Sequence, residues 1–248
     1  MKPIEKLALA LKSSPGVVFT GAGVSTNSGI PDFRSETGFY NKYHEDDLAI
    51  EAYFNNPDKF YNAFWEKFSN VFDAKPNDTH KILAELEQLG LLKGIITQNV
   101  DRLHQKGGSK NVIEFHGNIF DYNMIQITNK SKHLYRIIQS DVPIQSLLNG
   151  NQIDYRNGNY LYKPQVVLYG EGITKWSESV SLSNAVKTHI IIGTSYVVSP
   201  FNMISYDNKY EDLKVFIINN EPIEYHGRAT QIIGDCSKIL RELMTYIK

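Results

Sequence analysis

Two glycines, an acidic residue (Asp32) and a basic residue (Arg34) lie close together in the stretch "VVFTGAGVSTNSGIPDFRS", which runs from Val17 to Ser35. Four apolar or β-branched residues precede Gly21 and Gly23, so we expect a strand that ends in a tight turn with accessible backbone N–H groups. Such a turn suits a pyrophosphate, and Ser25 offers a hydroxyl nearby. The spacing is not G-x-G-x-x-G, and the absence of Gly-Lys-Ser/Thr excludes a P-loop. The stretch predicts an unusual dinucleotide site.

Amides, a carboxylate and an imidazole follow two later strand-like runs. Gln98, Asn99 and Asp101 come after "GIIT", and His116 comes after "NVIEF". Ligands of open α/β sheets bind at the carboxyl ends of the strands, and a histidine with an ordinary pKa near ~6.5 is mostly a base at neutral pH. Each residue also has a structural alternative, since an Asp can cap a helix and a single histidine can be a buried core residue.

Alternating strand-like and helical segments are expected to position these residues. Short, mostly apolar runs predict strands at 17–20, 94–97, 111–115, 164–169, 189–193 and 213–219. Amphipathic patterns predict helices at 3–13, 79–90, 178–188 and 235–247. This alternation predicts an α/β fold, a Rossmann-like doubly wound parallel sheet with a small inserted module and a helical lid region.

Two regions interrupt the alternation and set the expected domain division. Residues 36–75 are rich in aromatic side chains, which favours a helical core or lid over a cofactor site. Residues 118–163 are polar, and Asn149-Gly150 and Asn157-Gly158 in them are hairpin signals. The expected parts are a Rossmann-like dinucleotide-binding domain at 1–35, 76–117 and 164–248, an aromatic cofactor-loop and lid segment at 36–75, and a small module at 118–163.

The bulk composition excludes several classes of partner. The chain has 248 residues, 42% of them hydrophobic, and a formal net charge of −1 at pH 7. This charge gives no general attraction to nucleic acid or to an anionic membrane, and no apolar run reaches the ~20 residues of a spanning helix. The single cysteine, Cys236, excludes an internal disulfide and a zinc site made of several thiolates. We expect a cytoplasmic protein with no nucleic-acid or membrane partner.

Six motifs resemble those of the sirtuins, the NAD-dependent protein deacylases. They are, in chain order, "GAGVSTNSGIPDFRS" (21–35), "TQNVDRLHQKGG" (97–108), "EFHGN" (114–118), "KPQVVLYGE" (163–171), "GTSYVVSP" (193–200) and "INNE" (218–221). The resemblance covers nearly the whole chain except residues 119–162. It implies NAD as the cofactor and an acyl-lysine protein or peptide as the substrate.

The resemblance also implies the contacts of the cofactor. The glycine turn would cradle the pyrophosphate, residues 32–34 would close over the nicotinamide and its ribose, and Asn219 with Glu221 would hold the adenosine ribose. The expected cofactor contacts are Gly21, Ala22, Gly23, Ser25, Asp32, Phe33, Arg34, Gln98, Asn99, Asp101, Gly193, Thr194, Ser195, Asn219, Glu221 and Cys236.

His116 and Asn99 are the catalytic residues that the resemblance implies. In the family's reaction the acyl-lysine carbonyl oxygen attacks the ribose C1′ and nicotinamide leaves through a cationic state, which neutral amides such as Asn99 suit. His116 then takes a proton from a ribose hydroxyl, and water completes release of the lysine and an O-acyl-ADP-ribose. General-base catalysis of this kind contributes about 10²–10⁴-fold.

The substrate segment and the small module follow from the same resemblance. The acyl-lysine peptide is expected to add as a strand to "VVLYGE", with Val167, Tyr169, Gly170 and Glu171 as contacts. The family carries four cysteines in the small module, whereas residues 118–163 contain none. We therefore expect no metal there, and a zinc-independent module held by packing around Ile119, Phe120, Leu134, Tyr135, Ile137, Leu147, Leu148 and Leu161.

Two other functions use the same motifs. An NAD glycohydrolase or ADP-ribosyltransferase would keep the NAD site but use water or another acceptor. A non-catalytic NAD-sensing module would bind the dinucleotide without turnover. The loop "PDFRS", which guards against hydrolysis in the family, disfavours the first, and Arg34, Asn99 and His116 together disfavour the second.

Overall fold

The computed structural model describes residues 1–31, 44–149 and 152–248 of the chain. Its contacts divide the chain into two compact units. Unit 1 comprises Met1–Asp32, Ala74–Phe115 and Thr174–Lys248, and unit 2 comprises Phe33–Asp73 and His116–Ile173.

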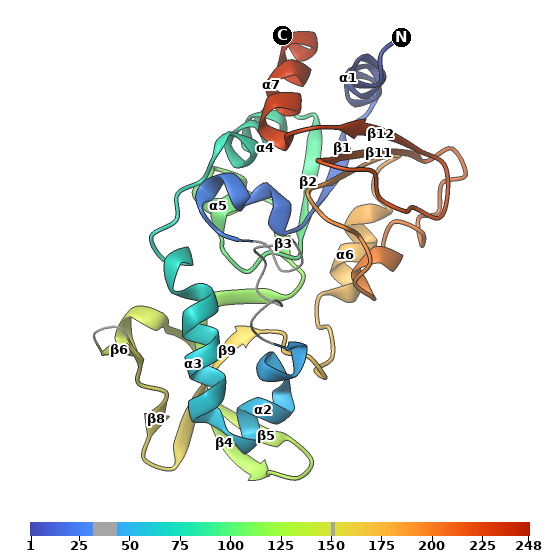
Figure 1. Cartoon of the computed structure of the whole chain (residues 1–248). Helices are drawn as coiled ribbons and strands as arrows, with labels where there is room; N and C mark the ends of the chain where they lie inside the picture. The colour runs from blue at the N-terminus through green and yellow to red at the C-terminus, as the bar shows by residue number, and fades with distance from the viewer. Residues whose placement is uncertain (32–43, 150–151) are drawn as a thin grey trace. The chain divides into compact units, whose positions relative to one another are not determined.

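Unit 1 is built on a six-stranded parallel sheet with the strand order β12-β11-β10-β1-β2-β3 (Figure 1). Its strands are β1 Gly16–Thr20, β2 Leu92–Thr97, β3 Val112–Glu114, β10 Thr188–Ile192, β11 Lys214–Asn219 and β12 Ala229–Ile233. From β1 the chain adds strands on one side, and from β10 it adds them on the other. The order reverses between β1 and β10, which is where open α/β sheets bind ligands.

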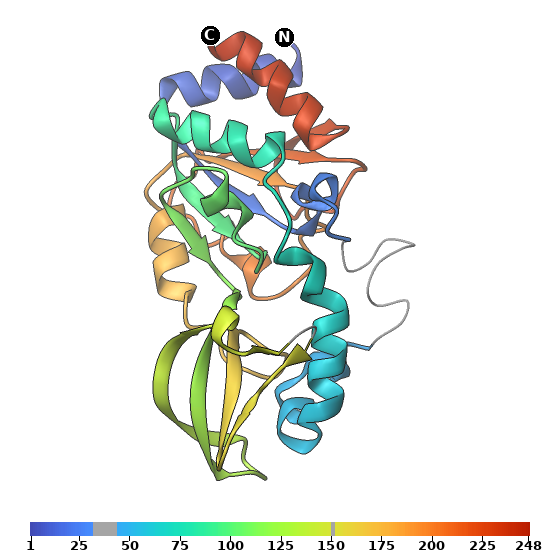
Figure 2. The same cartoon turned by 90° about the vertical axis from the view of Figure 1, so that its left-hand side faces the viewer.

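Helices cover both faces of this sheet (Figure 2). Three lie on one face, α1 Pro3–Ser13, α4 Asp78–Gln88 and α7 Cys236–Ile247, and α6 Trp176–Ser183 lies on the other. Buried leucines from the three helices, such as Leu7 and Leu240, pack against Val18 and Ile190 of the sheet. A short helix, α5 Leu103–Lys106, follows β2. The predicted doubly wound Rossmann-like sheet is confirmed.

Most of the predicted strands and helices occur in unit 1, with two corrections. The strand expected at 164–169 is displaced: β9 covers Tyr160–Val166 and pairs antiparallel with β4 in unit 2. An apolar run has the same appearance in either kind of sheet, so the pattern could not assign its partner. Strand β12 was not predicted, because polar Thr230 and Gln231 interrupt the apolar residues of "ATQII". An edge strand with one open side permits this.

Unit 2 contains a four-stranded antiparallel sheet of order β5-β4-β9-β8 and the helices α2 and α3. Its elements are α2 Ile50–Asn55, α3 Pro57–Phe68, β4 Gly117–Asn129, β5 Leu134–Pro143, β6 Leu148–Asn149, β7 Gln152–Ile153, β8 Arg156–Asn157 and β9 Tyr160–Val166. Asn157 pairs with Tyr160 across a turn in which Gly158 has a φ of +58°, so the hairpin predicted at Asn157-Gly158 is confirmed.

Aromatic side chains form the core of unit 2. Tyr53, Phe60 and Phe64 are fully buried, which confirms a structural role for the rings of α2 and α3. In the small module Ile119 is also buried, as predicted, together with Leu147 and Leu161. The prediction was wrong for Leu134, Ile137 and Leu148, which are 52%, 48% and 39% exposed. Strand β5 is an edge strand with most of its side chains in solvent, which leaves these three apolar side chains exposed.

Candidate active site

The loops that follow β1 and β10 touch each other where the strand order reverses. The Gly23 N–H donates to the Gly193 carbonyl oxygen over 2.8 Å. A side-chain carbon on Gly193, whose φ is +60°, would lie 2.6 Å from the Val24 nitrogen. These loops need glycine for their own packing. The Gly21 N–H is also engaged, because it donates to the Ile192 carbonyl over 3.3 Å, so a pyrophosphate would compete for both N–H groups.

Ser25 is the centre of a buried polar network in unit 1. Its hydroxyl donates to Asp101 Oδ2 over 2.6 Å and accepts from Asn99 Nδ2 over 3.2 Å. His80 Nε2 lies 3.4 Å from the same oxygen, and it must donate because His80 Nδ1 already accepts the Asn77 N–H. One donated and two accepted bonds use the full capacity of a hydroxyl. Ser25, expected to reach a phosphate, has its proton committed to Asp101.

The backbone of Asn99 and the carboxylate of Asp101 are held by hydrogen bonds to neighbouring residues of the chain. The Asn99 N–H donates to Thr97 Oγ1 over 3.0 Å, and Asp101 Oδ1 accepts the N–H of Leu103, the first residue of α5, over 2.9 Å. Asp101 therefore combines the predicted capping alternative with its bond to Ser25. Burial raises the pKa of Asp101, although both bonds oppose the rise. Within the described part of the chain, Asn99 Oδ1 has no hydrogen-bond partner, so it can accept from a ligand.

Gln98 and Thr194 join three strand ends. Thr194 Oγ1 donates to Gln98 Oε1 over 2.8 Å, and the Gln98 N–H donates to the Thr20 carbonyl over 2.9 Å. Gly21 lies against this pair, since a side-chain carbon there would approach Thr194 Cβ to 2.6 Å. Ser195 follows and is exposed. The predicted contacts at the ends of β1, β2 and β10 thus come together.

Two histidines in this network were given no role from the sequence. His80 contacts Ser25, and His104 Nε2 lies 2.9 Å from Thr20 Oγ1. The two rings are 4.9 Å apart, edge to face. Burial lowers the pKa of His80 to about 4 and that of His104 well below its usual value, so both are neutral at pH 7. His104 and Asn99 belong to the same motif, "TQNVDRLHQKGG". This shared motif was the feature of the sequence that could have indicated a place for His104 in the network.

The residues predicted for the adenosine ribose lie at the end of β11. Asn219 Nδ2 donates to the Glu221 carbonyl over 3.3 Å, and the Glu221 side chain is exposed. Cys236 is buried, with Sγ 3.9 Å from the Ile218 carbonyl oxygen. Burial raises the pKa of Cys236 to about 11, so it is a neutral thiol and not a nucleophile.

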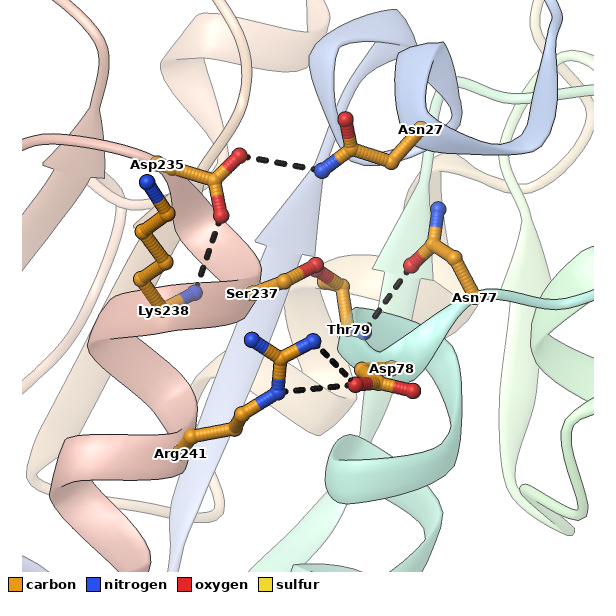
Figure 3. A network of polar contacts seen from close by, with 8 residues as sticks. All are labelled: Asn27, Asn77, Asp78, Thr79, Asp235, Ser237, Lys238 and Arg241. Atoms are coloured by element: carbon orange, nitrogen blue, oxygen red, sulfur yellow. Dashed lines mark hydrogen bonds and ion pairs between the residues drawn. The ribbon is translucent and has the colours of Figure 1, made fainter.

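A second polar network ties the loop after β1 to helices α4 and α7 (Figure 3). Asn27 Nδ2 donates to Asp235 Oδ2 over 2.9 Å, and Asp235 caps α7 through the Lys238 N–H. Between the helices, Thr79 Oγ1 and Ser237 Oγ are 2.9 Å apart. On the α4 side, Asn77 Nδ2 donates to Ser28 Oγ over 3.0 Å, so residues 26–28 are held from the starts of both helices.

His116 begins unit 2, two residues after the end of β3. Its carbonyl oxygen accepts the Val167 N–H over 2.8 Å. Gly117 has a φ of +75°, and a side-chain carbon there would lie 1.9 Å from the Gln165 carbonyl oxygen, so no other residue fits this crossing. The predicted base and the predicted substrate segment share one backbone contact.

The predicted substrate segment is held by a buried ion pair. Lys163 Nζ lies 2.8 Å from Glu171 Oε2, and the Leu168 N–H donates to the same carboxylate over 2.9 Å. Burial lowers the pKa of Lys163, although Glu171 opposes the shift. Glu171, expected to contact substrate, is thus engaged with Lys163. Tyr169 is 39% exposed, its carbonyl accepts the Ile50 N–H over 2.9 Å, and Gly170 turns the chain with a φ of +89°.

Asp32, Phe33 and Arg34 lie outside the described residues. Among residues 1–31, 44–149 and 152–248, no three His, Cys, Asp or Glu side chains gather closely enough to hold a metal ion. No helix in these same ranges is long and apolar enough to span a membrane.

Comparisons with known proteins agree with this arrangement. Residues 21–200 match the Sir2 family. The chain is 40% identical to the NAD-dependent protein deacylase of Pyrococcus furiosus over 241 residues, 96% of this chain and 94% of the relative. It is 35% identical to the NAD-dependent protein deacetylase of Sulfolobus acidocaldarius over 244 residues, 97% and 93% of the two chains. A solved Sir2 structure with a deacetylated p53 peptide and 3′-O-acetyl ADP ribose is 33% identical, with a TM-score of 0.84 over 99% of this chain and 98% of that chain.

Proposed function

Because the chain belongs to the Sir2 family, we infer that it is an NAD-dependent protein deacylase. The observation that carries this conclusion is identity of 33–40% to relatives named NAD-dependent protein deacetylase or deacylase over most of both chains. The sirtuin resemblance of the six motifs is confirmed. The specific roles of the residues below are our proposals.

The strand ends of unit 1 fit a dinucleotide. The reversal of strand order lies between β1 and β10, and the loops there present backbone and neutral polar side chains. Asn219 and Glu221, at the end of β11, are proposed to hold the adenosine ribose. Ala22 has no hydrogen-bond partner for its N–H in the described part of the chain, so it is the N–H of the glycine turn that a pyrophosphate can take without a competing bond.

The chemistry is proposed to rest on Asn99 and His116. NAD, when bound, supplies a nicotinamide leaving group and a ribose that accepts the acyl group. Asn99 Oδ1 accepts from a ribose hydroxyl, and its carboxamide is oriented by the bond from Nδ2 to Ser25. His116 accepts a proton from a ribose hydroxyl as general base. Asp32, Phe33 and Arg34 are proposed to close over the nicotinamide end.

The acyl-lysine peptide is proposed to bind at residues 167–170. Tyr169 offers an exposed ring beside Val167, and the turn at Gly170 ends the segment. Because Glu171 is paired with Lys163, we assign it the task of shaping this segment and not of meeting the peptide. A cytoplasmic location stays a prediction.

We also propose that the small module works without zinc. Aromatic contacts from α3 support it: the Tyr61 and Tyr155 rings stack with centroids 4.4 Å apart, and the Tyr61 hydroxyl donates to the Tyr162 carbonyl. Tyr155 donates in turn to Asp58 of the same helix. Incubation with a strong zinc chelator is expected to leave both the melting temperature and the turnover unchanged. Stoichiometric zinc in the purified protein, with lost stability on its removal, would contradict the proposal.

One incubation tests the function and separates the alternatives. The chain is mixed with NAD and an acetyl-lysine peptide, and the products are identified by mass. O-acetyl-ADP-ribose with free lysine peptide supports the deacylase, whereas free ADP-ribose or a modified acceptor supports a glycohydrolase or ADP-ribosyltransferase. NAD binding without turnover would indicate a sensing module. His116→Ala is expected to abolish deacylation and to leave NAD affinity largely intact, and retained activity would refute the assignment of the base.

A further inference from the structure

A chain of buried hydrogen bonds runs from Asn99 to a histidine that the proposed chemistry does not use. The Asn99 N–H donates to Thr97 Oγ1 over 3.0 Å, and Thr97 Oγ1 also accepts the Thr20 hydroxyl over 2.8 Å. Thr20 Oγ1 lies 2.9 Å from His104 Nε2. Thr20, Thr97 and His104 are each at least 98% buried, so no solvent can replace a lost partner.

The direction of every bond in this chain is fixed. The one proton of the Thr20 hydroxyl goes to Thr97, so His104 Nε2 must be the donor to Thr20. His104 is therefore the neutral tautomer with its proton on Nε2. Its Nδ1 has no partner among the residues that the structure describes. A second proton at Nδ1 would be a buried cation without a counter-charge, which keeps the ring neutral.

The strand pairing and a helix start bring these groups together. Thr20 and Thr97 are the last residues of β1 and β2, and they are paired directly across the two strands. Asp101 accepts the Leu103 N–H, which begins α5, and His104 follows in its first turn. The segment "TQNVDRLH" therefore reverses direction. Its last residue, His104, contacts Thr20, and Thr20 bonds to the first residue of the segment, Thr97.

The consequence concerns the carboxamide of Asn99. Its backbone N–H is held by Thr97 and its Nδ2 by Ser25, which are two separate anchors on either side of the Cα. Removal of one anchor lets the carboxamide shift, and catalysis is sensitive to displacements of about 1 Å. Removal of the His104 donor leaves Thr20 Oγ1 with one bond fewer in a dry site, so the threonine pair can reorient away from the Asn99 N–H.

We propose that His104 is a positioning residue for deacylation: through Thr20 and Thr97 it fixes the backbone of Asn99, and so the direction of its carboxamide. This inference rests on the proposed function. His104 does not touch Asn99 Oδ1, and it acts on the reaction through the intervening hydroxyls only.

The test compares two substitutions at His104 with one at a second buried histidine. His104→Leu removes the donor, whereas His104→Gln keeps an N–H at the end of the side chain. Steady-state turnover of an acetyl-lysine peptide is expected to show kcat lowered on the order of tenfold in His104→Leu, with KM for NAD within about twofold, and largely restored in His104→Gln. His189→Leu is the matched control, because His189 is fully buried in the same unit but bonds to Ser183 and Asn208.

A purely structural role predicts a different pattern. In that case His104→Leu and His189→Leu would lower the melting temperature alike and leave kcat of the folded fraction unchanged, which would overturn the proposal. Thr97→Val removes the acceptor of the Asn99 N–H at nearly constant volume and is expected to reproduce the loss of kcat even if His104→Leu does not fold. A wild-type chain without turnover would contradict the proposed function and this inference together, whereas normal turnover in wild type and Thr97→Val would contradict the inference alone.

Discussion

Acidification from pH 7.5 to pH 5 is expected to destabilise the folded chain through its buried histidines. His80 and His189 are fully buried in unit 1. Burial lowers the pKa of each from 6.5 to about 4. In the folded state both rings stay neutral at pH 5, whereas in the unfolded chain both are protonated. The stabilisation is therefore complete above pH 6.5 and is lost as the pH falls towards 4.

The size of the effect follows from the two pKa values. At pH 5 each histidine lowers the free energy of unfolding by about 2 kcal/mol relative to neutral pH, so the pair removes about 4 kcal/mol. His104 adds to this loss, because burial and the neighbouring His80 lower its pKa well below its usual value. A loss of this size is a large part of the stability of an ordinary domain, which is about 5–15 kcal/mol.

Urea unfolding, followed by tryptophan fluorescence at a series of pH values, measures this dependence. His189→Gln keeps an N–H donor for the Ser183 carbonyl, now 3.2 Å from His189 Nε2, and removes the titrating group. This variant is expected to abolish about half of the decrease in the free energy of unfolding that His80 and His189 together cause on acidification. His226→Gln, at an exposed position, is the matched control and should retain the wild-type dependence. A free energy of unfolding that stays flat from pH 7.5 to pH 5 would refute the reasoning.

Two further predictions concern the packing of the loops. Gly193→Ala combines a positive φ with a contact of 2.6 Å to the Val24 nitrogen, so it is expected to lower the free energy of unfolding by about 3 kcal/mol or more and to weaken NAD binding. Gly29→Ala, with a φ of +82° and nothing within 4 Å, isolates the backbone penalty and should cost about 1 kcal/mol; equal costs for the two would mean that the loops do not touch. Lys163→Met leaves the Glu171 carboxylate without its ammonium partner in a mostly buried site and is expected to cost about 3–5 kcal/mol in urea unfolding. The double variant Lys163→Met/Glu171→Gln should recover part of that loss, and a single variant as stable as wild type would show that the pair is solvated.

The sequence was sufficient for five of the six strands of the sheet in unit 1, all but β12, and for the family. Buried parallel strands are apolar along their whole length, and helices repeat their apolar residues every three to four positions, so both patterns are visible locally. The glycine turn and the residues after "GIIT" could be placed at strand ends for the same reason. The aromatic helices of unit 2 followed from composition, because so many rings must be buried somewhere.

Only the tertiary structure decided which partners these residues have. Ser25 meets His80, which is 55 positions away in the sequence, and Thr20 meets His104, which is 84 positions away. Strand β9 joined the antiparallel sheet, and Leu134, Ile137 and Ile138 of β5 stayed in solvent. Local patterns fix the type of an element because hydrogen bonding and burial along one segment determine it. Contacts between distant segments depend on which strand ends and helix starts meet, and no pattern within a single segment carries that information.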